Sequence, residues 1–323
     1  MILLIKIALV LIVVVLLAAY MVLVERKLLG RFQIRFGPNR AGIFGMLQPI
    51  ADGIKLLLKE DIVPEAGDRL VFMYAPAVAA AMPLLILAVV PFGGTFVFQG
   101  QQVPMVIADL NVGLLYVLAL SSLAVYGVAL GGWASNSKFS LLGAIRAAAQ
   151  MISYELSLGL SLVPIVMLAR SLSLVDIVNA QAHYPFLLVQ PVAFLVFFIS
   201  AIAESKRLPF DLPEAESELM AGYHTEYSGM RFALYFLGEY VNMIMLGALV
   251  AVFFLGGWHG PVLPGTFWFL LKVLFVPFML IWSRATLPRL RYDQLMHFGW
   301  KFLVPVALLN IVVTGGVILW LHG

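Results

Sequence analysis

Eight long runs of apolar residues alternate with shorter polar stretches along the chain. Each run is long enough to cross the ~30 Å hydrocarbon core of a bilayer as an α-helix, which rises about 1.5 Å per residue. The expected spans are residues 3–24, 70–91, 108–131, 144–169, 187–203, 231–255, 264–283 and 301–321, with approximate ends. The pattern predicts an all-α, polytopic transmembrane protein with about eight membrane helices in one integral membrane domain, residues 1–323.

The first polar stretch, residues 25–69, carries a pattern of its own. After the turn signal Gly37-Pro38-Asn39, polar residues recur at helical spacing and apolar residues occupy another face; the polar ones are Gln48, Asp52, Lys55 and Lys59. This spacing predicts an amphipathic helix on the membrane surface. Two roles are open for it, namely an anchor held by anionic lipid or a helix that packs on a partner protein.

Lysine and arginine are distributed unevenly between the polar stretches. Seventeen of the twenty lie within four polar stretches or at the ends of the spans next to them. These stretches are residues 25–69, 132–143, 204–230 and 284–300, and the three exceptions are Lys6, Arg170 and Lys272. Cytoplasmic loops of membrane proteins carry the excess of positive residues. These four loops are therefore expected in the cytoplasm, with both termini on the opposite, periplasmic side.

Composition supports the membrane class and narrows the chemistry. Apolar residues make up 63% of the chain and charged residues only 11%, too few to cover a water-soluble surface. The absence of cysteine excludes disulfides, thiolate metal sites and iron–sulfur ligation, and the five histidines form no i,i+4 pair. No glycine-rich turn suited to a nucleotide is present. A redox centre within this chain is therefore not expected.

Two glutamates lie deep inside predicted spans. Glu155 is nine residues beyond Arg146, and Glu239 is eight residues beyond Arg231, so both lie about 12–14 Å from the expected cytoplasmic ends of their spans. Tyr235 and Asn242 share the helix face of Glu239. An ionisable residue at this depth costs roughly 2.5–3.5 kcal/mol on insertion, which favours a functional role over a tolerated accident.

The cytoplasmic stretch 204–230 is unusually rich in acidic residues, which are Glu204, Asp211, Glu214, Glu216, Glu218 and Glu226. Like charges raise one another's pKa values, so proton handling is one physical reason to gather them. Pro213 suits the first turn of a short helix on which Glu214 and Glu218 stack at i,i+4. A solvated acidic helix start is the alternative. Together with Glu239 and Glu155, the acids predict a ladder from the cytoplasmic surface to the bilayer centre.

Several long motifs resemble one known family. They are residues 25–39 (ERKLLGRFQIRFGPN), residues 150–155 (QMISYE), the acidic stretch, residues 238–240 (GEY) and residues 288–294 (PRLRYDQ). Over nearly the whole chain they resemble the NuoH-type membrane subunit of proton-pumping NADH:quinone oxidoreductase, respiratory complex I.

This resemblance implies a subunit that encloses a quinone chamber together with hydrophilic partners and couples quinone reduction to proton translocation. From charge alone, Glu25, Arg26 and Arg35 are an ordinary positive-inside flank; by the resemblance they match the chamber's mouth and wall, with Asp52 on the adjoining helix. The resemblance also assigns a set of acids to the proton path: Glu155, Glu204, Asp211, Glu214, Glu216, Glu218, Glu226 and Glu239.

The resemblance further implies the surroundings of the chain. Quinone is the substrate at the interface, while FMN and the iron–sulfur clusters belong to partner subunits on the cytoplasmic side. Antiporter-like and small membrane subunits are expected laterally, with membrane lipid and no nucleic acid. The implied location is the bacterial cell inner membrane.

Two other functions are compatible with parts of the pattern. A membrane subunit of a related energy-converting hydrogenase would explain the cytoplasmic charge but would leave the chamber-mouth residues unused. A stand-alone cation or proton transporter would also use midplane acids, yet the chain has no convincing internal repeat of the kind such transporters carry.

Overall fold

The computed structural model describes residues 2–98, 101–211 and 222–322. It confirms the all-α membrane fold class, including the short amphipathic helix in the first polar stretch. In chain order, the helices are α1 (Ile2–Phe32), η1 (Ile43–Gly45), α2 (Gln48–Leu58), α3 (Arg69–Ile86), η2 (Leu87–Val89), α4 (Gly113–Ala134), α5 (Lys138–Ala169), α6 (Leu174–Ala180), α7 (Phe186–Val189), α8 (Pro191–Glu204), η3 (Gly222–His224), α10 (Gly229–Phe253), α11 (Gly265–Thr286), α12 (Tyr292–Phe298), η4 (Gly299–Leu303) and α13 (Val304–His322).

Seven helical stretches within the described ranges are long and apolar enough to cross a membrane: α1, α3 with η2, α4, α5, α10, α11 and the continuous run from α12 to α13. The span expected at residues 187–203 differs. It is divided into α7 and the 14-residue α8, which rises only about 21 Å. The backbone of Gln190 is non-helical, and Pro191 has no N–H to continue a helix but suits a first turn, so α8 begins later than expected.

The first helix continues past its expected end. The sequence pattern ends this span at residue 24 and begins a loop at 25, whereas α1 extends to Phe32. The intervening residues are mostly good helix formers and can leave the hydrocarbon core without ending the helix. The chain turns only near Ile34, which has a left-handed backbone with φ of 55°. Glu25 and Arg26 are therefore on a rigid helix and not in a loop.

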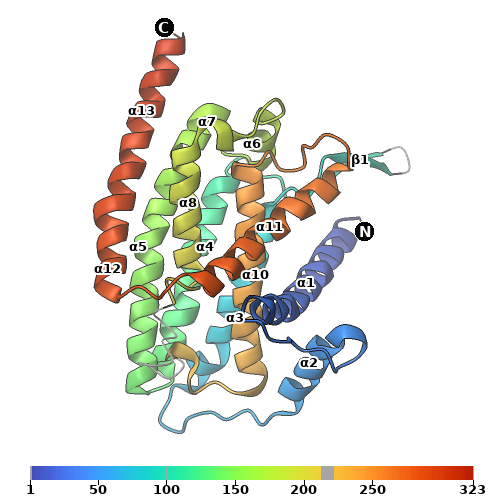
Figure 1. The fold of residues 1–323 in the computed structure, drawn as a ribbon, viewed down its shortest axis with the longest axis vertical. Helices are drawn as coiled ribbons and strands as arrows, with labels where there is room; N and C mark the ends of the chain where they lie inside the picture. Colours follow the sequence, from blue (N-terminus) through green and yellow to red (C-terminus); the bar gives the residue numbers. More distant parts are fainter. Residues whose placement is uncertain (1, 99–100, 212–221, 323) are drawn as a thin grey trace.

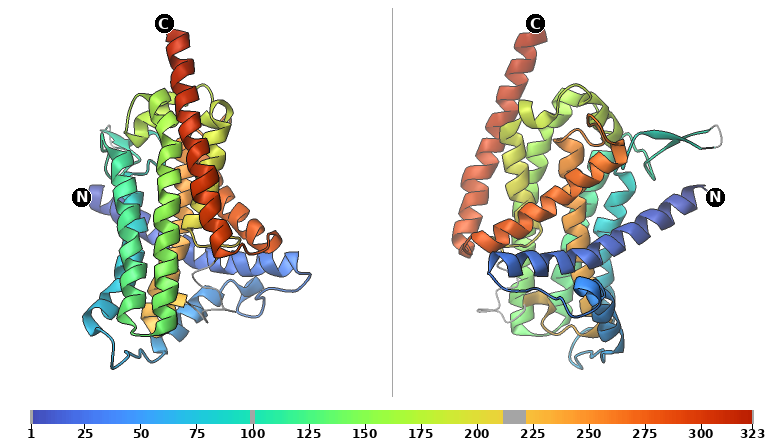
Figure 2. Two further views of the ribbon diagram at one scale, coloured as in Figure 1. Left: turned by 90° about the vertical axis from the view of Figure 1, so that its left-hand side faces the viewer. Right: turned by 45° about the vertical axis from the view of Figure 1, so that its right-hand side comes forward.

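Helix α10 forms the centre of the bundle (Figure 1). It packs against α3, α11 and α1, while α4 joins α3 to α5, and α5 packs against α8 and α13. In the most apolar 18-residue stretch of α10, 78% of the residues are buried. In the corresponding stretch of Tyr292–Leu321, only 17% are buried. A helix that is apolar on all sides belongs in such a core. The end of α13 projects beyond α7, and α1 is strongly inclined to α5 and α10 (Figures 1 and 2).

The connections at the opposite end from α2 include one feature absent from the expected pattern. Strands β1 (Thr95–Phe98) and β2 (Gln101–Pro104) pair antiparallel as a small hairpin between α3 and α4.

Two other connections are held by side chains. Ser173 caps the start of α6, because its hydroxyl accepts a hydrogen bond from the Asp176 amide. Lys272 of α11 donates to three backbone carbonyls after α10, those of Leu255, Gly257 and His259. This lysine satisfies carbonyls of the loop that follows α10.

Close packing of α3 on α4 depends on a glycine. A Cβ at Gly127 would lie 2.6 Å from the Ala79 amide nitrogen, whereas a Cβ at Gly316 on α13 would meet no atom within 4 Å. We expect Gly127→Leu to lower the free energy of unfolding by about 1–3 kcal/mol, because the overpacked helices must separate. Gly316→Leu gains the same helix propensity without a clash and is the matched control. Thermal unfolding in detergent compares them, and equal stability of the two variants would contradict the packing role.

Candidate functional site: a carboxylate cavity and a buried ion-pair cluster

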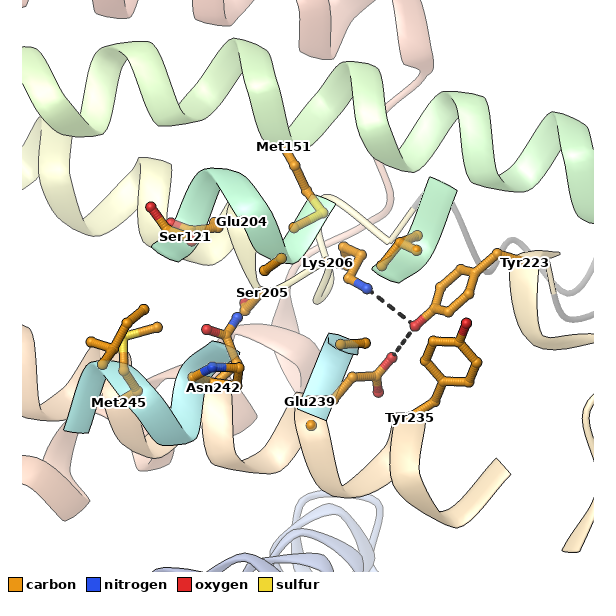
Figure 3. Close-up of a pocket in the computed structure, with 16 residues that line it drawn as sticks. Ser121, Met151, Glu204, Ser205, Lys206, Tyr223, Tyr235, Glu239, Asn242 and Met245 are labelled. Atoms are coloured by element: carbon orange, nitrogen blue, oxygen red, sulfur yellow. Dashed lines mark hydrogen bonds between the residues drawn. The ribbon is translucent and has the colours of Figure 1, made fainter. Parts of the chain in front are cut away.

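A cavity with both polar and apolar lining residues lies at the middle of the bundle, between α3, α4, α5, the end of α8, η3 and α10 (Figure 3). We call it the carboxylate cavity, because Glu204 and Glu239 line it together with Ser121, Lys206, Tyr223, Tyr235 and Asn242. Its volume of about 40 Å³ exceeds the roughly 10–15 Å³ that one water needs, so it has room for about three waters. The cavity can therefore support a hydrogen-bonded chain between its acids.

One end of the cavity holds a continuous set of hydrogen bonds. The Tyr223 hydroxyl donates to Glu239 at 2.8 Å and accepts from Lys206 Nζ at 3.1 Å, as Figure 3 shows. The ammonium of Lys206 also lies 4.5 Å from the centre of the Tyr223 ring. Tyr223 is fully buried. A tyrosine hydroxyl can both donate and accept, so Tyr223 joins a cation to a carboxylate.

The other end of the cavity leads to Glu155. Its carboxylate accepts hydrogen bonds from Ser121 at 2.9 Å and from Ser122 at 2.5 Å. Ser121 also lines the cavity beside Glu204 (Figure 3). Glu204 is buried and lies close enough to Glu155 for the two charges to interact. Glu204 of α8 and Glu239 of α10 thus line one cavity, and Glu155 of α5 is joined to its lining through Ser121.

A second cluster surrounds Glu25, which is only 2% exposed. Its carboxylate accepts hydrogen bonds from Arg207 at 2.7 Å, from the Tyr240 hydroxyl at 2.6 Å, and from Arg284. The Arg207 guanidinium also stacks 4.8 Å from the centre of the Tyr240 ring. We call these four residues the Glu25 cluster. They come from α1, the segment after α8, α10 and α11, so one carboxylate joins four parts of the fold.

The segment 204–211 connects the cavity to the Glu25 cluster. After α8 ends, Lys206 takes a left-handed backbone with φ of 54°, which turns the chain as residues after helix ends commonly do. Lys206 then contacts the cavity, while Arg207 contacts Glu25. Arg207 interacts electrostatically with both Glu25 and Glu239, which raises its pKa further above its usual range.

Asp211 and His224 lie close enough to Glu239 for their charges to interact. Burial raises the pKa of Asp211, although Arg289, at 3.3 Å, opposes the shift. Burial also lowers the pKa of His224, against the attraction of Glu239. Desolvation disfavours the charged form of both groups. Burial therefore shifts both groups toward their neutral forms.

The remaining residues of the expected chamber lie at the surface of α1 and α2. Arg26 pairs with Asp52 at 2.8 Å, and Gln48 also donates to Asp52 at 3.0 Å. The pair is partly exposed, with 44% of the Arg26 side chain accessible. Arg35 is exposed and donates to Gln33. The fold thus brings Arg26 to Asp52 but separates Arg35 from them, and it turns Glu25 inward.

No group of three or more histidines, aspartates and glutamates within residues 2–98, 101–211 and 222–322 is placed to hold a metal ion.

Comparison with known proteins identifies the family. A family model described as NADH dehydrogenase matches residues 5–315. The chain belongs to the NADH dehydrogenase family. An NADH-quinone oxidoreductase subunit of Syntrophobacter fumaroxidans is 67% identical over 316 residues, which cover 98% of this chain and 96% of that protein. The equivalent subunit of Syntrophotalea carbinolica is 63% identical, over 98% of this chain and 96% of that protein. That of Thermomicrobium roseum is 57% identical, over 94% of this chain and 92% of that protein.

The described structure of this NADH dehydrogenase family member leaves some expected site residues apart. Glu226 is exposed on the loop before α10 and does not line the cavity. Glu214, Glu216 and Glu218 lie outside the described residues, as does the short helix expected after Pro213.

Sequence reasoning also missed residues that complete the site. Arg207, Arg284 and Tyr240 were not connected to Glu25, and Lys206 and Tyr223 were not connected to Glu239. The adjacent hydroxyls Ser121 and Ser122 interrupt an apolar span, a signal that could have marked them as partners for a buried acid. The arginines carried no comparable signal, because they match the general excess of positive charge in cytoplasmic loops.

The Glu25 cluster predicts a large stability effect. Glu25→Gln should lower the free energy of unfolding by roughly 3–5 kcal/mol, because it leaves the buried charge of Arg207 unpaired. Asp293→Asn is the control: Asp293 pairs with Arg291 at 2.6 Å, but both side chains are exposed, so no measurable change is expected. Thermal unfolding of the detergent-extracted protein measures both, and a Glu25→Gln protein as stable as the control would contradict the structural role of the cluster.

Proposed function

We propose that this chain is the membrane subunit of a proton-translocating NADH:quinone oxidoreductase that forms the quinone chamber with hydrophilic partners and couples quinone reduction to proton translocation. The observation that carries the proposal is that Glu204 and Glu239 line one cavity, while Glu155 accepts a hydrogen bond from Ser121 in the lining of the same cavity. Each acid alone costs free energy in a membrane helix. Three helices that bring their acids to the same place are better explained by proton handling than by stability.

The contacts around the cavity support a proton path. Tyr223 and Lys206 reach Glu239 from the cytoplasmic loop, and Ser121 joins the other end of the cavity to Glu155. Hydroxyl groups donate and accept at once, and a few waters complete such a chain. In this proposal, protons move between the carboxylates through Tyr223, cavity water and the serine hydroxyls.

The segment 204–211 supplies the coupling. Arg207 interacts with both Glu25 and Glu239, and Asp211 also interacts with Glu239. Negative charge formed on the reduced quinone near Arg26 and Glu25 raises the proton affinity of nearby acids. A shift of Arg207 toward the new charge would leave Glu239 less stabilised as a carboxylate, which favours proton uptake at the cavity.

The chamber is proposed on the cytoplasmic side of α1. Arg26 and Asp52 are ion-paired there and partly accessible, as residues that meet a substrate or a partner must be. Arg35 belongs to the same surface by the family resemblance. The polar face of α2 then packs on a hydrophilic partner, and its apolar residues, such as Ile54 and Leu58, face lipid.

The remaining assignments follow from the family. FMN and the iron–sulfur clusters belong to hydrophilic partner subunits, and antiporter-like and small membrane subunits adjoin laterally. The uneven distribution of lysine and arginine supports an inner-membrane protein with its α2 side in the cytoplasm and both termini outside.

The cavity predicts the behaviour of Glu239 variants. Glu239→Gln preserves size but cannot titrate, so it should lower quinone-coupled proton uptake by tenfold or more, while Glu239→Asp retains a measurable part. A tenfold loss corresponds to about 1.4 kcal/mol. The measurement is quinone-dependent turnover and proton uptake of the assembled complex in reconstituted vesicles.

One control and one further variant accompany these measurements. Glu65→Gln removes an exposed acid of the first loop and should retain wild-type uptake. Tyr223→Phe keeps the aromatic packing but removes the hydroxyl, and should resemble Glu239→Gln. Wild-type uptake by an assembled Glu239→Gln complex would remove Glu239 from the mechanism.

The chamber predicts a separate phenotype. Arg26→Ala should raise the quinone KM or lower quinone reduction, because it removes a charge beside the proposed chamber. Electron transfer from NADH to an artificial acceptor should persist, since that reaction needs only the partner subunits. Arg69→Ala, an exposed arginine at the start of α3, is the control. Parallel loss of both activities in a fully assembled Arg26→Ala complex would contradict the chamber assignment.

A further inference from the structure

A second, larger hollow lies along the N-terminal half of α1, away from the ion pair of Arg26 with α2. This groove runs between α1, α10, α11 and the segment that follows β2, and its volume is about 560 Å³. That volume falls within the range of about 300–1,000 Å³ typical of ligand pockets. We call it the α1 groove. It does not share lining residues with the carboxylate cavity or include members of the Glu25 cluster.

The lining of the α1 groove is almost entirely hydrocarbon. Its side chains include Leu9 and Val13 of α1 and Phe269 and Val273 of α11, and the lining residues other than Lys6 and Thr266 are all apolar. A surface of this kind offers a quinone headgroup or a polar substrate no hydrogen bonds. It suits an alkyl chain.

The length of the α1 groove matches one leaflet of a bilayer. Its lining on α1 extends from Ile5 to Leu17, a rise of about 18 Å along the helix axis. Because α1 is strongly inclined to the other helices, the corresponding depth is smaller (Figure 2). Half of the hydrocarbon core is ~15 Å thick. An acyl chain of a lipid in the leaflet near the α1 N-terminus therefore fits along the groove.

A single positive charge lies near the N-terminal end of this lining. Lys6 Nζ donates to the backbone carbonyls of Pro104 at 2.7 Å and Val106 at 3.3 Å. These two bonds hold the ammonium in place but leave its charge uncompensated, and one of its three protons stays available. The ion pairs formed in the described parts of the chain do not include Lys6.

We infer that the α1 groove binds a membrane phospholipid with an anionic headgroup, whose phosphate contacts Lys6 and whose acyl chain packs against α1, α10 and α11. A fixed cation at one end of a leaflet-length hydrocarbon surface has the charge and shape complementary to such a lipid. The inference does not depend on the proposed proton path. It concerns a lipid that holds the inclined α1 to α11 at the end remote from Glu25.

Photolabelling tests the inference in the intact membrane complex. The probes are phosphatidylglycerol and phosphatidylcholine that carry the same photoactivatable acyl chain, and the readout is labelled peptides of residues 5–17 and 266–273. Phosphatidylglycerol should label these peptides about fivefold more, the ratio that ~1 kcal/mol for one lysine corresponds to. Equal labelling by the two lipids would overturn the anionic assignment.

Variants separate the headgroup from the acyl chain. Lys6→Gln should reduce phosphatidylglycerol labelling to the level of phosphatidylcholine, and Lys6→Arg should restore it. Val13→Trp fills the groove and should suppress labelling by both lipids, whereas Ile12→Trp changes an exposed neighbour outside the groove and should not. Unchanged labelling in Val13→Trp would overturn the groove as the site.

Two further outcomes would assign a different occupant. Competition by a long-tailed quinone, stronger than by unlabelled phosphatidylglycerol, would identify the groove as a quinone-tail site and overturn the inference. Cross-links from a photoreactive residue at Leu9 to a partner polypeptide, without lipid adducts, would identify a subunit interface and overturn it as well. Because none of these readouts uses turnover, their failure is distinguishable from failure of the proposed function.

Discussion

The buried carboxylate of Glu25 is the constraint on which the arrangement of the site depends. Its partners Arg207, Tyr240 and Arg284 lie 182, 215 and 259 residues away along the chain. Burial of these charges is costly, and only their mutual pairing and hydrogen bonding offset the cost. The native arrangement of α1, α10 and α11 at this end is therefore strongly preferred over one that leaves any of these charges unpaired. Because Arg207 must reach Glu25, this ion pair also determines the path of the segment 204–211.

That segment gives the site its coupling. Lys206 and Arg207 are adjacent in sequence, yet one contacts the carboxylate cavity and the other contacts Glu25. A change of charge near Glu25 can act on Glu239 through one short stretch of backbone and through the field of Arg207. A chamber at the α1 surface, as proposed, would need no long-distance rearrangement of the bundle to act on acids in the bundle interior.

The surrounding bundle keeps the cavity small. Gly127 lets α4 approach α3 closely, and Gly238 on α10 lies against the backbone of α3 near Ala80. Tyr235 lines the cavity while its hydroxyl donates to the Gly127 carbonyl. Tightly packed backbones and fixed hydroxyls limit the space for water in the cavity, and charges interact more strongly where water is scarce.

The sequence by itself determined the membrane class, the positions of most helices and the presence of Glu155 and Glu239 inside apolar spans, because hydropathy and helical period are local properties. Its motifs also indicated the family. The tertiary contacts show in addition that α8 is short and that α1 carries Glu25 inward and Arg26 outward. They also place Glu204 and Glu239 in the lining of one cavity with Glu155 beside it, leave Glu226 exposed, and let Arg207 and Arg284 share one carboxylate. These features depend on contacts between residues far apart in the chain, and their free energies arise from burial and charge pairing that no local window of sequence contains.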